Sequence, residues 1–311
     1  MLTNAVVFEH PGRLTLGDLA LAEPEAGDVV VTVQASGISA GTERLLWEGR
    51  MPAFPGLGYP LVPGYEAVGE VVDAGPEASF RAGDQVFVPG SNAFDGAHGI
   101  FGAAAEQLVV PSRRVTSLPA GLEETGILLT LAATAHHALA HPHSSLPDLI
   151  VGHGLLGRLI ARLTVALGGD RPTIWERQAA RRTGFDGVID PDTDETQAYD
   201  TIIDASGDPA ILDTAIAKLH RGGEIILAGF YATPLHFAFP PAFMREARIR
   251  VTAEFLPEDI HAVLALMDQD RLSLDGLISH RRPANEATDA YATAFGDPSC
   301  LKMLLTWRDA A

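Results

Sequence analysis

The chain has 311 residues, of which 47% are hydrophobic and 20% charged, and this balance is typical of a globular protein with a sizeable core rather than of a disordered chain. Its formal net charge of −18 argues against a general affinity for nucleic acids or anionic lipids. A single cysteine, Cys300, excludes an internal disulfide framework and a multi-cysteine zinc site within one chain.

No membrane span and no secretory signal are expected. The sequence has no uncharged apolar run of about 18 residues, and its first residues, MLTNAVVFEHPGR, lack a basic segment before an apolar core. We therefore expect an acidic, intracellular, soluble globular protein of about two domains.

The pattern of residues 1–121 predicts short strands separated by turns. Five β-branched runs carry this prediction: NAVVFE, DVVVTVQASGI, YEAVGEVVDAG, GDQVFVPG and AEQLVVP. Strands at such close spacing predict a barrel or a sandwich. Between them lies the irregular stretch LLWEGRMPAFPGLGYPLVPG (45–64), and a loop of this length in a compact domain is usually functional.

From Leu122 to residue 275, strands and helices alternate. The helical stretch LEETGILLTLAATAHHALAH is followed by the predicted strands DLIVGHG, PTIWE, GVID, TIIDASG and GEIILAGFY, with helical segments among them. Such alternation predicts a parallel sheet covered by helices, which is a doubly wound α/β fold. Residues 276–311 form a last segment that ends in an apolar, strand-like run.

The segment VGHGLLG places Gly152, Gly154 and Gly157 in the G-x-G-x-x-G spacing. It follows an apolar strand and precedes a helical pattern that opens at Leu155, which is the context of a dinucleotide site. Glycines at these positions permit the tight turn, the approach of backbone N–H groups to a pyrophosphate, and the packing of the helix on the strand. The helix N-terminus adds its positive dipole end. The motif therefore predicts a dinucleotide cofactor.

The choice between NAD and NADP depends on the end of the second strand. Glu176 lies 19 residues after Gly157, where a carboxylate is expected to accept the ribose 2′-hydroxyl of NAD. The next residue, Arg177, is able to bind the 2′-phosphate of NADP instead. Because Glu176 would repel that phosphate, the sequence favours NAD, and NADP remains the alternative.

Two further strands of the same sheet, TIIDASG (201–207) and IILAGFY (225–231), end in small residues. Ligands of doubly wound sheets bind at the carboxyl ends of the strands. We therefore expect the nicotinamide half of the cofactor at these two strand ends. The residues expected there are Ser206, Gly207, Gly229 and Phe230.

Four landmarks of the first domain are GISAGTE (37–43), PGYEAVGEVVDAG (63–75), GDQV (83–86) and AEQLVVP (105–111). Together with the cofactor motif they resemble the medium-chain dehydrogenase/reductase superfamily, over nearly the whole chain. The resemblance implies an α/β protein with three parts. These are a GroES-like β-barrel catalytic domain (1–121), a Rossmann NAD-binding domain with a doubly wound parallel sheet (122–275), and a C-terminal return to the catalytic domain (276–311).

The sequence departs from the zinc-dependent members of that superfamily at their metal ligands. Those members carry a Cys in the first landmark and Gly-His-Glu in the second, whereas this chain has Ser39 and Tyr65 and keeps only Glu66. The third ligand position falls near Thr130, and the four-cysteine structural lobe is absent from the sequence. Hydroxyl groups are poor zinc ligands, and one carboxylate does not hold the ion. We therefore expect no metal site.

Longer motifs run from end to end of the chain, among them WEGRMPAFPGLGYPLVPGYEAVGEVV, LIVGHGLLGRLIARLT and PAFMREARIR. They resemble one subfamily, the dehydrogenases that act on the hydroxyethyl group of bacteriochlorophyllide a in photosynthetic bacteria. The resemblance implies NAD-dependent oxidation of the C3 1-hydroxyethyl group to acetyl, a step of bacteriochlorophyll biosynthesis. It also implies a tetrapyrrole substrate and a cytoplasmic protein, with peripheral binding to the photosynthetic membrane left open, and it is compatible with a homodimer.

A planar tetrapyrrole requires an apolar cleft with a few polar groups that orient it. The 45–66 loop offers Trp47, Met51, Phe54 and Tyr59, and the 230–244 stretch offers Phe230, Tyr231, Phe237, Phe239, Phe243 and Met244. The residues assigned to the macrocycle are Trp47, Met51, Phe54 and Tyr231. Packing in the core is the alternative for each of them.

The substrate also carries a propionate, which an acidic protein repels unless a local cation receives it. Arginine is suited to this role because it binds a carboxylate through two hydrogen bonds. The assigned residues are Arg44 and Arg50, and further candidates are Arg245, Arg281 and Arg282.

Oxidation of an alcohol requires hydride transfer to the nicotinamide and loss of the hydroxyl proton. The residues expected to accept or direct that proton are Thr42, Tyr65, Glu66 and His98. Tyrosine has an ordinary pKa of about 10, so that Tyr65 needs a cationic neighbour to act as a base. Otherwise it is a hydrogen-bond donor that orients the alcohol, or it packs with Glu66 beneath the site. His136 and His137 lie in an apolar helical stretch and are expected to be structural.

Two other functions fit the same motifs. One is a zinc-free quinone or enone reductase of the same superfamily that uses NADPH. The other is a non-catalytic carrier that binds a nucleotide and delivers pigment. Cofactor preference separates the first from the alcohol dehydrogenase, and the absence of turnover identifies the second.

Overall fold

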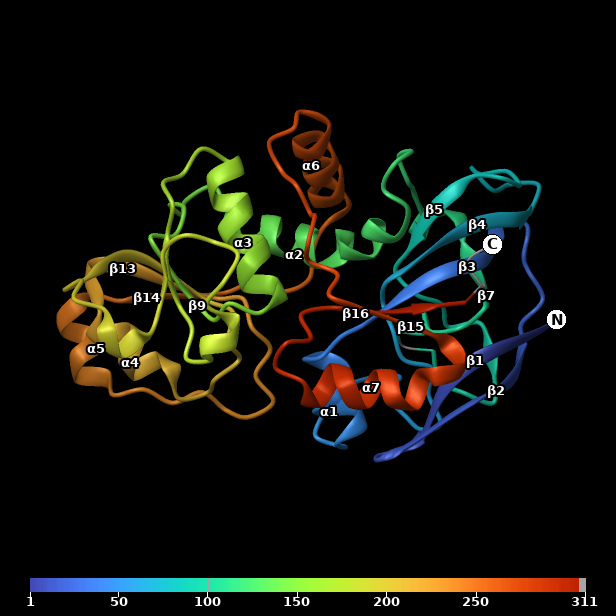
Figure 1. Ribbon diagram of the computed structural model, residues 1–311, viewed down its shortest axis with the longest axis horizontal. Helices are drawn as coiled ribbons and strands as arrows, with labels where there is room; N and C mark the ends of the chain where they lie inside the picture. The colour runs from blue at the N-terminus through green and yellow to red at the C-terminus, as the bar shows by residue number, and fades with distance from the viewer. Residues whose placement is uncertain (100, 308–311) are drawn as a thin grey trace. The chain divides into compact units, whose positions relative to one another are not determined.

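The computed structural model describes residues 1–99 and 101–307 (Figure 1). By its internal contacts the chain divides into two compact units, which we call unit 1 (Met1–Thr130 and Asp275–Ala311) and unit 2 (Leu131–Leu274). The boundary expected from the sequence lay at residue 121. The 3₁₀ segment η2 (Glu123–Leu128) instead packs against strands of unit 1 and buries Ile127 and Leu128 completely. Residues 122–130 therefore belong with unit 1.

Unit 1 is built on two sheets. The smaller sheet contains β1 (Leu2–His10), β2 (Arg13–Leu21) and β6 (Phe94–Asp95). The larger sheet has the order β15 (His280–Pro283), β16 (Met303–Thr306), β3 (Asp28–Ile38), β4 (Ala67–Ala74), β5 (Gln85–Val88) and β8 (Thr116–Ser117), and β7 (Gln107–Pro111) also pairs with β3. The β-branched residues of β3 are buried almost throughout, as expected of a central strand. The predicted strand-rich fold of this part is confirmed.

The C-terminal segment completes the larger sheet of unit 1. Strand β16 lies antiparallel to β3, with Leu304 opposite Gly37 and Leu305 opposite Ser36. The helical elements of this unit are α1 (Thr42–Trp47), η1 (Ser112–Arg114), η2, η5 (Ala284–Glu286) and α7 (Ala287–Gly296). Residues from the two ends of the sequence thus share one sheet.

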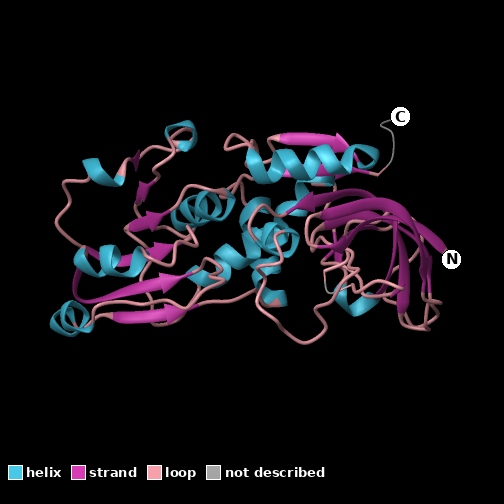
Figure 2. Cartoon of the chain, turned by 90° about the horizontal axis from the view of Figure 1, so that it is seen from below, coloured by secondary structure: helices cyan, strands magenta, loops and turns pink. Residues whose placement is uncertain are grey.

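Unit 2 contains a six-stranded parallel sheet, visible as arrows in Figure 2. Its order is β11 (Val188–Ile189), β10 (Thr173–Trp175), β9 (Leu149–Val151), β12 (Tyr199–Asp204), β13 (Leu219–Leu227) and β14 (Arg248–Val251). The chain starts at β9 in the middle, runs outward through β10 and β11, and then returns to the other side of β9 at β12. This is the doubly wound order, and the predicted α/β class is confirmed.

The helices of unit 2 cover both faces of this sheet. They are α3 (Leu155–Ala166), α4 (Ile211–Ala217), α5 (Phe239–Arg245), α6 (Pro257–Asp268), most of α2 (Leu129–Leu139), and the short 3₁₀ segments η3 (Ala179–Arg181) and η4 (Pro191–Thr193). In Figure 1, α3 lies on one face, and α4 and α5 lie on the other. Right-handed crossovers in opposite directions from β9 produce this arrangement. Among the helices of the described residues, none is long and apolar enough to cross a membrane.

Candidate functional site

The glycine-rich turn lies at the carboxyl end of β9, where the strand order of unit 2 reverses. Gly152 has a φ of 95°, and a Cβ there would lie 3.0 Å from the Cα of Ser206. A Cβ at Gly157 would lie 1.9 Å from the carbonyl oxygen of Gly152, so the first turn of α3 packs directly on the loop. Both positions therefore require glycine, for the backbone reasons expected from the sequence.

The N-terminus of α3 is open at Gly154. This residue is the N-cap, it makes no side-chain cap, and a Cβ built on it would meet nothing within 4 Å. The first turn of α3, which starts at Leu155, therefore has its N–H groups free of a side-chain cap. Such a helix end is suited to an anion, and the pyrophosphate of a dinucleotide is the anion that the motif predicts.

Glu176 is held beside this turn by two backbone donors. It follows β10, is 8% exposed, and accepts the N–H of His153 at 3.0 Å through Oε2 and that of Gln178 at 2.8 Å through Oε1. Each carboxylate oxygen keeps acceptor capacity beyond these bonds. The carboxylate is thus oriented in advance and is able to receive a ribose hydroxyl.

Sequence reasoning missed His153, which lies between the first two glycines of the motif. Its side chain is fully buried, and Nδ1 lies 2.7 Å from the carbonyl oxygen of Arg181. Because a carbonyl only accepts, Nδ1 carries the proton. Burial lowers the pKa of His153, which keeps the ring neutral. The imidazole therefore connects the glycine-rich turn to η3. The spacing of the glycines alone does not predict this connection.

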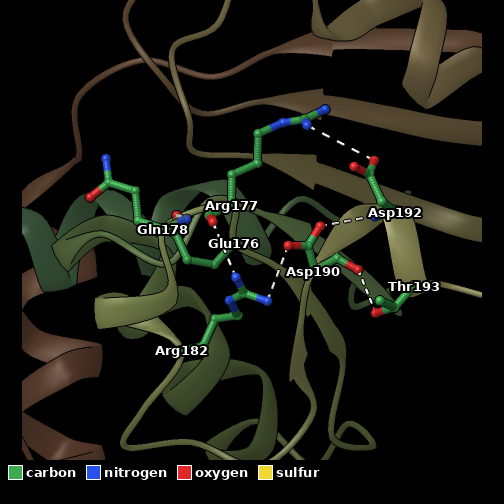
Figure 3. Close-up of polar contacts among 7 residues, drawn as sticks. All are labelled: Glu176, Arg177, Gln178, Arg182, Asp190, Asp192 and Thr193. Carbon is green, nitrogen blue, oxygen red and sulfur yellow. Dashed lines mark hydrogen bonds and ion pairs between the residues drawn. The ribbon is translucent and has the colours of Figure 1, made fainter.

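Two arginines that follow Glu176 in the sequence lie near carboxylates (Figure 3). Arg177, the predicted alternative ligand for a 2′-phosphate, points toward Asp192, with 3.9 Å between Nη1 and Oδ1. Arg182 contacts Asp190 at 3.1 Å through Nη1 and donates to the carbonyl oxygen of Arg177 at 3.3 Å through Nη2. The strand end therefore carries an acidic residue, one arginine paired with a carboxylate, Arg182, and one that remains largely exposed, Arg177.

The ends of β12 and β13 lie against each other. A Cβ at Gly229 would lie 3.0 Å from the amide nitrogen of Gly207, so the turns after both strands touch through their backbones. Ser206 donates to Asp204 from its N–H at 3.1 Å and from its hydroxyl at 2.6 Å. Phe230 is 56% exposed beside them. The four residues predicted for the nicotinamide half thus form one cluster next to Gly152.

The hydroxyl of Tyr231, predicted to contact substrate, is engaged within unit 2. It donates to Oδ2 of the fully buried Asp204. Burial and the neighbouring carboxylate raise the pKa of Tyr231. Burial also raises the pKa of Asp204, although the hydrogen bonds from Ser206 and Tyr231 oppose this effect. The Tyr231–Asp204 contact links the end of β12 to the segment after β13. These two residues are far apart in sequence, so the sequence did not predict their contact.

Phe237, Phe239 and Phe243, further along the same stretch, lie elsewhere in unit 2. Arg245 of α5 donates to the carbonyl oxygens of Ala217 and Leu219, so α5 is anchored at the start of β13, whereas Gly229 follows its end. A cavity of about 510 Å³ there is lined by Arg221, Phe237, Phe239, Ala242, Phe243, Met244, Glu246, Ala247 and Ile249. The aromatic residues that line this cavity are therefore separated from Tyr231, which lies near the other end of β13.

In unit 1, a cluster of hydroxyls occupies the positions where zinc-dependent relatives carry ligands. The hydroxyl of Tyr65 donates to Oγ of Ser39 at 2.7 Å, and that of Thr130 donates to the carbonyl oxygen of Tyr65 at 3.3 Å. Burial, reinforced by Glu66, raises the pKa of Tyr65 well above its ordinary value, and hydrogen bonds to Ser39 and Thr42 only partly oppose this. Tyr65 is therefore a hydrogen-bond donor at neutral pH.

Glu66, predicted to handle a proton, forms a buried ion pair with Lys302. The two side chains are 1% and 2% exposed, and Nζ contacts Oε2. Burial raises the pKa of Glu66 while the ammonium group opposes the shift, and Oε1 has no hydrogen-bond partner within the described residues. A Cβ at Gly37 would lie 2.5 Å from Oε2, so this glycine makes room for the pair. Lys302, one of only two lysines in the chain, was missed.

A second buried carboxylate, Glu43, lies at the start of α1. It accepts the N–H of Ser39 and the hydroxyl of Tyr291, both at 2.8 Å. Burial raises the pKa of Glu43 to about 7, and the hydrogen bonds from Ser39 and Tyr291 oppose the shift. Glu43 thus fixes the backbone of the residue that accepts from Tyr65. The sequence analysis selected Thr42, the residue before Glu43, and did not select Glu43 itself.

The pKa of Glu43 predicts a pH dependence of stability. Since its pKa is higher in the folded protein than the ordinary value of 4.5, the folded state binds more protons between about pH 4.5 and 7, and stability falls as pH rises through that range. We expect the loss to approach about 3 kcal/mol at most. Unfolding by denaturant at several pH values should show this slope in the wild type and a shallower one in Glu43→Gln, where Glu66 and Asp204, whose pKa values are also raised, still contribute. The exposed Glu77→Gln is the control, and an unchanged slope in Glu43→Gln would contradict the assignment.

Most residues of the 45–64 loop pack on unit 1. The ring of Trp47 meets that of Phe8 edge-on at 5.5 Å, Met51 covers the same apolar cluster, and the hydroxyl of Tyr59 donates to the carbonyl oxygen of Leu46. Phe54 is 37% exposed. Of the predicted substrate residues of this loop, Phe54 is thus the one that presents a ring to solvent.

The arginines predicted for the propionate have partners. Arg44 and Arg50 both bind Glu48, at 2.7 and 2.8 Å, and their side chains remain 52% and 62% exposed. Arg281 pairs with Glu124 at 2.7 Å, and Arg282 lies 3.6 Å from Glu286. These exposed pairs contribute little to stability, so a bound carboxylate is able to compete for either arginine of the loop.

The three histidines selected in the sequence analysis lie in two environments. His98 is exposed, with its ring against Gly58, where a Cβ would lie 2.5 Å from Nε2. His136 and His137 both direct Nδ1 at Asp259, at 2.7 and 2.9 Å, and are structural, as expected. Within residues 1–99 and 101–307, no group of three or more His, Cys, Asp or Glu side chains is arranged to bind a metal ion.

Comparison with known proteins places these features in a family context. Residues 25–120 match the alcohol dehydrogenase GroES-like domain, and residues 171–269 match the zinc-binding dehydrogenase domain. The chain is 56% identical to a 2-desacetyl-2-hydroxyethyl bacteriochlorophyllide A dehydrogenase of Cereibacter sphaeroides and 54% identical to one of Rhodobacter capsulatus, with all of each chain covered. It is 26% identical to an L-threonine 3-dehydrogenase of Pyrococcus horikoshii, with 94% of each chain covered.

Solved structures share the fold. An alcohol dehydrogenase from Escherichia coli in complex with NADH superimposes with a TM-score of 0.86 at 22% identity, covering 98% of this chain and 99% of that one. A zinc-binding dehydrogenase from Sinorhizobium meliloti bound to NADP superimposes with a TM-score of 0.81 at 20% identity, covering 99% and 100%. At these identities the likeness extends to the fold alone, and the two structures hold different cofactors.

Proposed function

Because the chain belongs to the medium-chain dehydrogenase/reductase superfamily, and within it to the family of the bacteriochlorophyllide hydroxyethyl dehydrogenases, we propose that it oxidises the C3 1-hydroxyethyl group of a bacteriochlorophyllide to acetyl with NAD as acceptor. The observation that carries the proposal is the identity of 56% and 54% to two such enzymes over the whole chain. The family binds a nicotinamide cofactor. NAD as that cofactor and the absence of catalytic zinc are our own assignments.

The cofactor half of the proposal rests on the edge of the unit 2 sheet. The residues assigned to NAD are Gly152, Gly154, Leu155, Gly157, Glu176, Ser206, Gly229 and Phe230. The free first turn of α3 suits the pyrophosphate, and the pre-oriented carboxylate of Glu176 suits the ribose hydroxyls. Arg177 is the residue that would favour NADP, and the carboxylate of Glu176 directly before it, which repels a 2′-phosphate, argues against that role.

Zinc does not fit the residues of unit 1. The three positions that correspond to the ligands of zinc-dependent relatives carry Ser39, Tyr65 and Thr130, whose hydroxyls are hydrogen-bonded among themselves and to the backbone. The remaining carboxylate, Glu66, is engaged by Lys302. A catalytic zinc takes three ligands from His, Cys, Asp or Glu. We therefore propose an oxidation in which no step involves a metal ion.

We assign the substrate hydroxyl to the hydroxyl cluster of unit 1. NAD, when bound, supplies the nicotinamide that accepts hydride from the carbinol carbon, and the substrate hydroxyl loses its proton. Tyr65 is protonated because its pKa is raised, and in the structure it donates that proton to Ser39; when substrate binds, the alcohol would replace Ser39 as the acceptor and be oriented by this bond. Ser39 and Thr42 are able to pass the proton on, since a hydroxyl both donates and accepts. His98, which is exposed, is the candidate for the final acceptor of this proton.

A direct assay tests the proposed function. The purified protein is incubated with NAD and the 3-(1-hydroxyethyl) bacteriochlorophyllide while the absorption band of the macrocycle is followed. An acetyl group conjugated to the ring should shift that band as NADH appears in equal amount. Turnover of a quinone with NADPH but not of the pigment would contradict the proposal, and so would tight binding of NAD and pigment without turnover.

Zinc dependence gives a separate prediction. Protein purified without added zinc should contain far less than one zinc ion per chain, and its activity should be unchanged after treatment with a chelator. Metal analysis and assays before and after chelation measure both. One tightly bound zinc per chain, with loss of activity on its removal, would overturn the zinc-free assignment.

Substrate binding by the 45–64 loop predicts an effect confined to one substrate. Phe54→Ala should raise the KM for the pigment by about tenfold and leave the KM for NAD unchanged, because an exposed ring that stacks on the macrocycle is lost. Steady-state kinetics with each substrate varied measures the two values. Val72→Ala, which removes another exposed apolar side chain of unit 1, is the control. Equal changes in both KM values would exclude Phe54 from pigment binding.

A further inference from the structure

A small charged cluster surrounds the end of β10, where Glu176 lies. Besides Glu176 it contains two arginines of the following segment, Arg177 and Arg182, and two carboxylates after β11, Asp190 and Asp192 (Figure 3). The two arginines are the groups of this cluster that would attract a phosphate on the adenosine ribose. What their guanidinium groups contact therefore affects which cofactor is accepted.

Arg182 is the more restrained of the two arginines. Its guanidinium lies between the carboxylate of Asp190 and the carbonyl oxygen of Arg177, at 3.1 and 3.3 Å, and its side chain is 28% exposed (Figure 3). The carbonyl that it contacts belongs to the residue directly after Glu176. The cation thus lies next to the position predicted for the ribose, and two bonds hold it there.

Asp190 is itself fixed in place. It is the N-cap of η4, with Oδ1 accepting the N–H of Asp192 at 3.1 Å while its carbonyl oxygen accepts the hydroxyl of Thr193 at 2.8 Å. Oδ2 is left to face Arg182. Because the cap sets the rotamer of the carboxylate, the ion pair with Arg182 requires little further ordering of Asp190.

We propose that Asp190 is a determinant of cofactor specificity in this dehydrogenase. Its carboxylate binds Arg182 and so removes one of the two cations that would otherwise attract a 2′-phosphate, while Glu176 repels that phosphate directly. NADP is thus disfavoured by two carboxylates, one directly after β10 and one directly after β11. The inference rests on the proposed use of NAD and adds to it a residue from the segment that follows β11.

Arg177 and Asp192 make a weaker pair of the same kind. Their closest atoms are 3.9 Å apart, and the side chains are 74% and 80% exposed. Solvent screens a pair with this exposure, so Asp192 restrains its arginine little. Asp192 therefore offers a control that changes the charge of the same cluster by the same amount.

Titration of the purified protein with NAD and with NADP, followed by calorimetry, tests the proposal without any pigment. Asp190→Asn keeps the side-chain oxygen that caps η4 and releases Arg182. We expect it to strengthen NADP binding relative to NAD by about tenfold, and Asp192→Asn to change the ratio by less than about twofold. In Asp190→Asn/Arg182→Met the gain should disappear, because the released cation is gone.

Two results would overturn the role of Asp190. One is an equal change of the ratio in Asp190→Asn and Asp192→Asn, which would reduce the effect to general charge. The other is a loss of NADP affinity in Arg182→Met alone, which would mean that Arg182 already contacts the phosphate in the wild type. The second measurement does not depend on the folding of Asp190→Asn. A wild type that prefers NADP would instead refute the proposed cofactor, so the two failures are distinguishable.

Discussion

Replacing Lys302 by methionine is expected to lower the free energy of unfolding by about 3–5 kcal/mol, because it leaves the carboxylate of Glu66 buried without its counter-charge. Oε1 of Glu66 has no hydrogen-bond partner in the described part of the chain, and Gly37 packs directly on the pair, so little is available to compensate. Chemical denaturation of the purified variant measures the loss.

Two variants separate the buried charge from the loss of a side chain. Glu66→Gln/Lys302→Met removes both charges and should recover most of the stability, since a buried pair replaced as a whole costs far less than one broken in half. Arg44→Met, which breaks an exposed pair with Glu48, should cost less than about 1 kcal/mol. A double variant as unstable as Lys302→Met would show that packing of the lysine stem, rather than charge, is what matters.

Replacing Glu176 by alanine is expected to weaken NAD binding by about ten- to a hundredfold and to relax discrimination against NADP. The ribose 2′-hydroxyl loses a charged acceptor, whose hydrogen bond is worth about 1.5–3 kcal/mol. The N–H groups of His153 and Gln178 lose their acceptor as well, so the glycine-rich turn loses part of its support. Binding titrations with both cofactors measure the change.

The control for Glu176→Ala is Glu195→Ala, which removes an exposed carboxylate from the same unit. It should leave both affinities unchanged. Unfolding curves for the two variants show whether weaker binding reflects a loosened turn. A Glu176→Ala variant that keeps wild-type affinity for both cofactors would refute the assignment of this strand end to the ribose.

The cofactor half of the site was accessible from the sequence because its residues are close together along the chain. Gly152, Gly154 and Gly157 lie within one strand-turn-helix unit, and local backbone geometry dictates glycine at two of these positions. The parallel sheet, predicted from alternating strands and helices, then brings the ends of β12 and β13 to the same edge. The superfamily, identified from motifs in both parts of the chain, was confirmed.

The partners of the buried charged groups of unit 1 could not be predicted from the sequence in the same way. Glu66 and Lys302 are separated by 236 positions, and Glu43 and Tyr291 by 248, and each pair forms only because the C-terminal segment joins the sheet and core that the first residues build. A lysine within the apolar run LKMLL was the available signal for a buried partner, since an unpaired buried ammonium group is too costly to retain.

Closeness in sequence did not determine where the aromatic residues lie. Phe237, Phe239, Phe243 and Met244 follow Tyr231 closely in sequence, yet α5 carries the last three to the start of β13 while Tyr231 remains near its end. Trp47 and Met51 pack on buried apolar residues of unit 1, because the long loop that carries them covers this part of the core. Density of aromatic residues alone does not distinguish a binding surface from packing.

The sequence by itself determined the fold class and the glycine-rich turn, since hydrophobic periodicity and glycine geometry are local properties that act over a few residues, and its motifs identified the family by resemblance. Only the tertiary structure decided which charges are free to act. Glu66 is neutralised by Lys302, Arg182 by Asp190, and the hydroxyl of Tyr65 faces Ser39. The physical reason is that the state of an ionisable or hydroxyl group depends on its burial and nearest partners, which strand pairing brings together from distant parts of the chain.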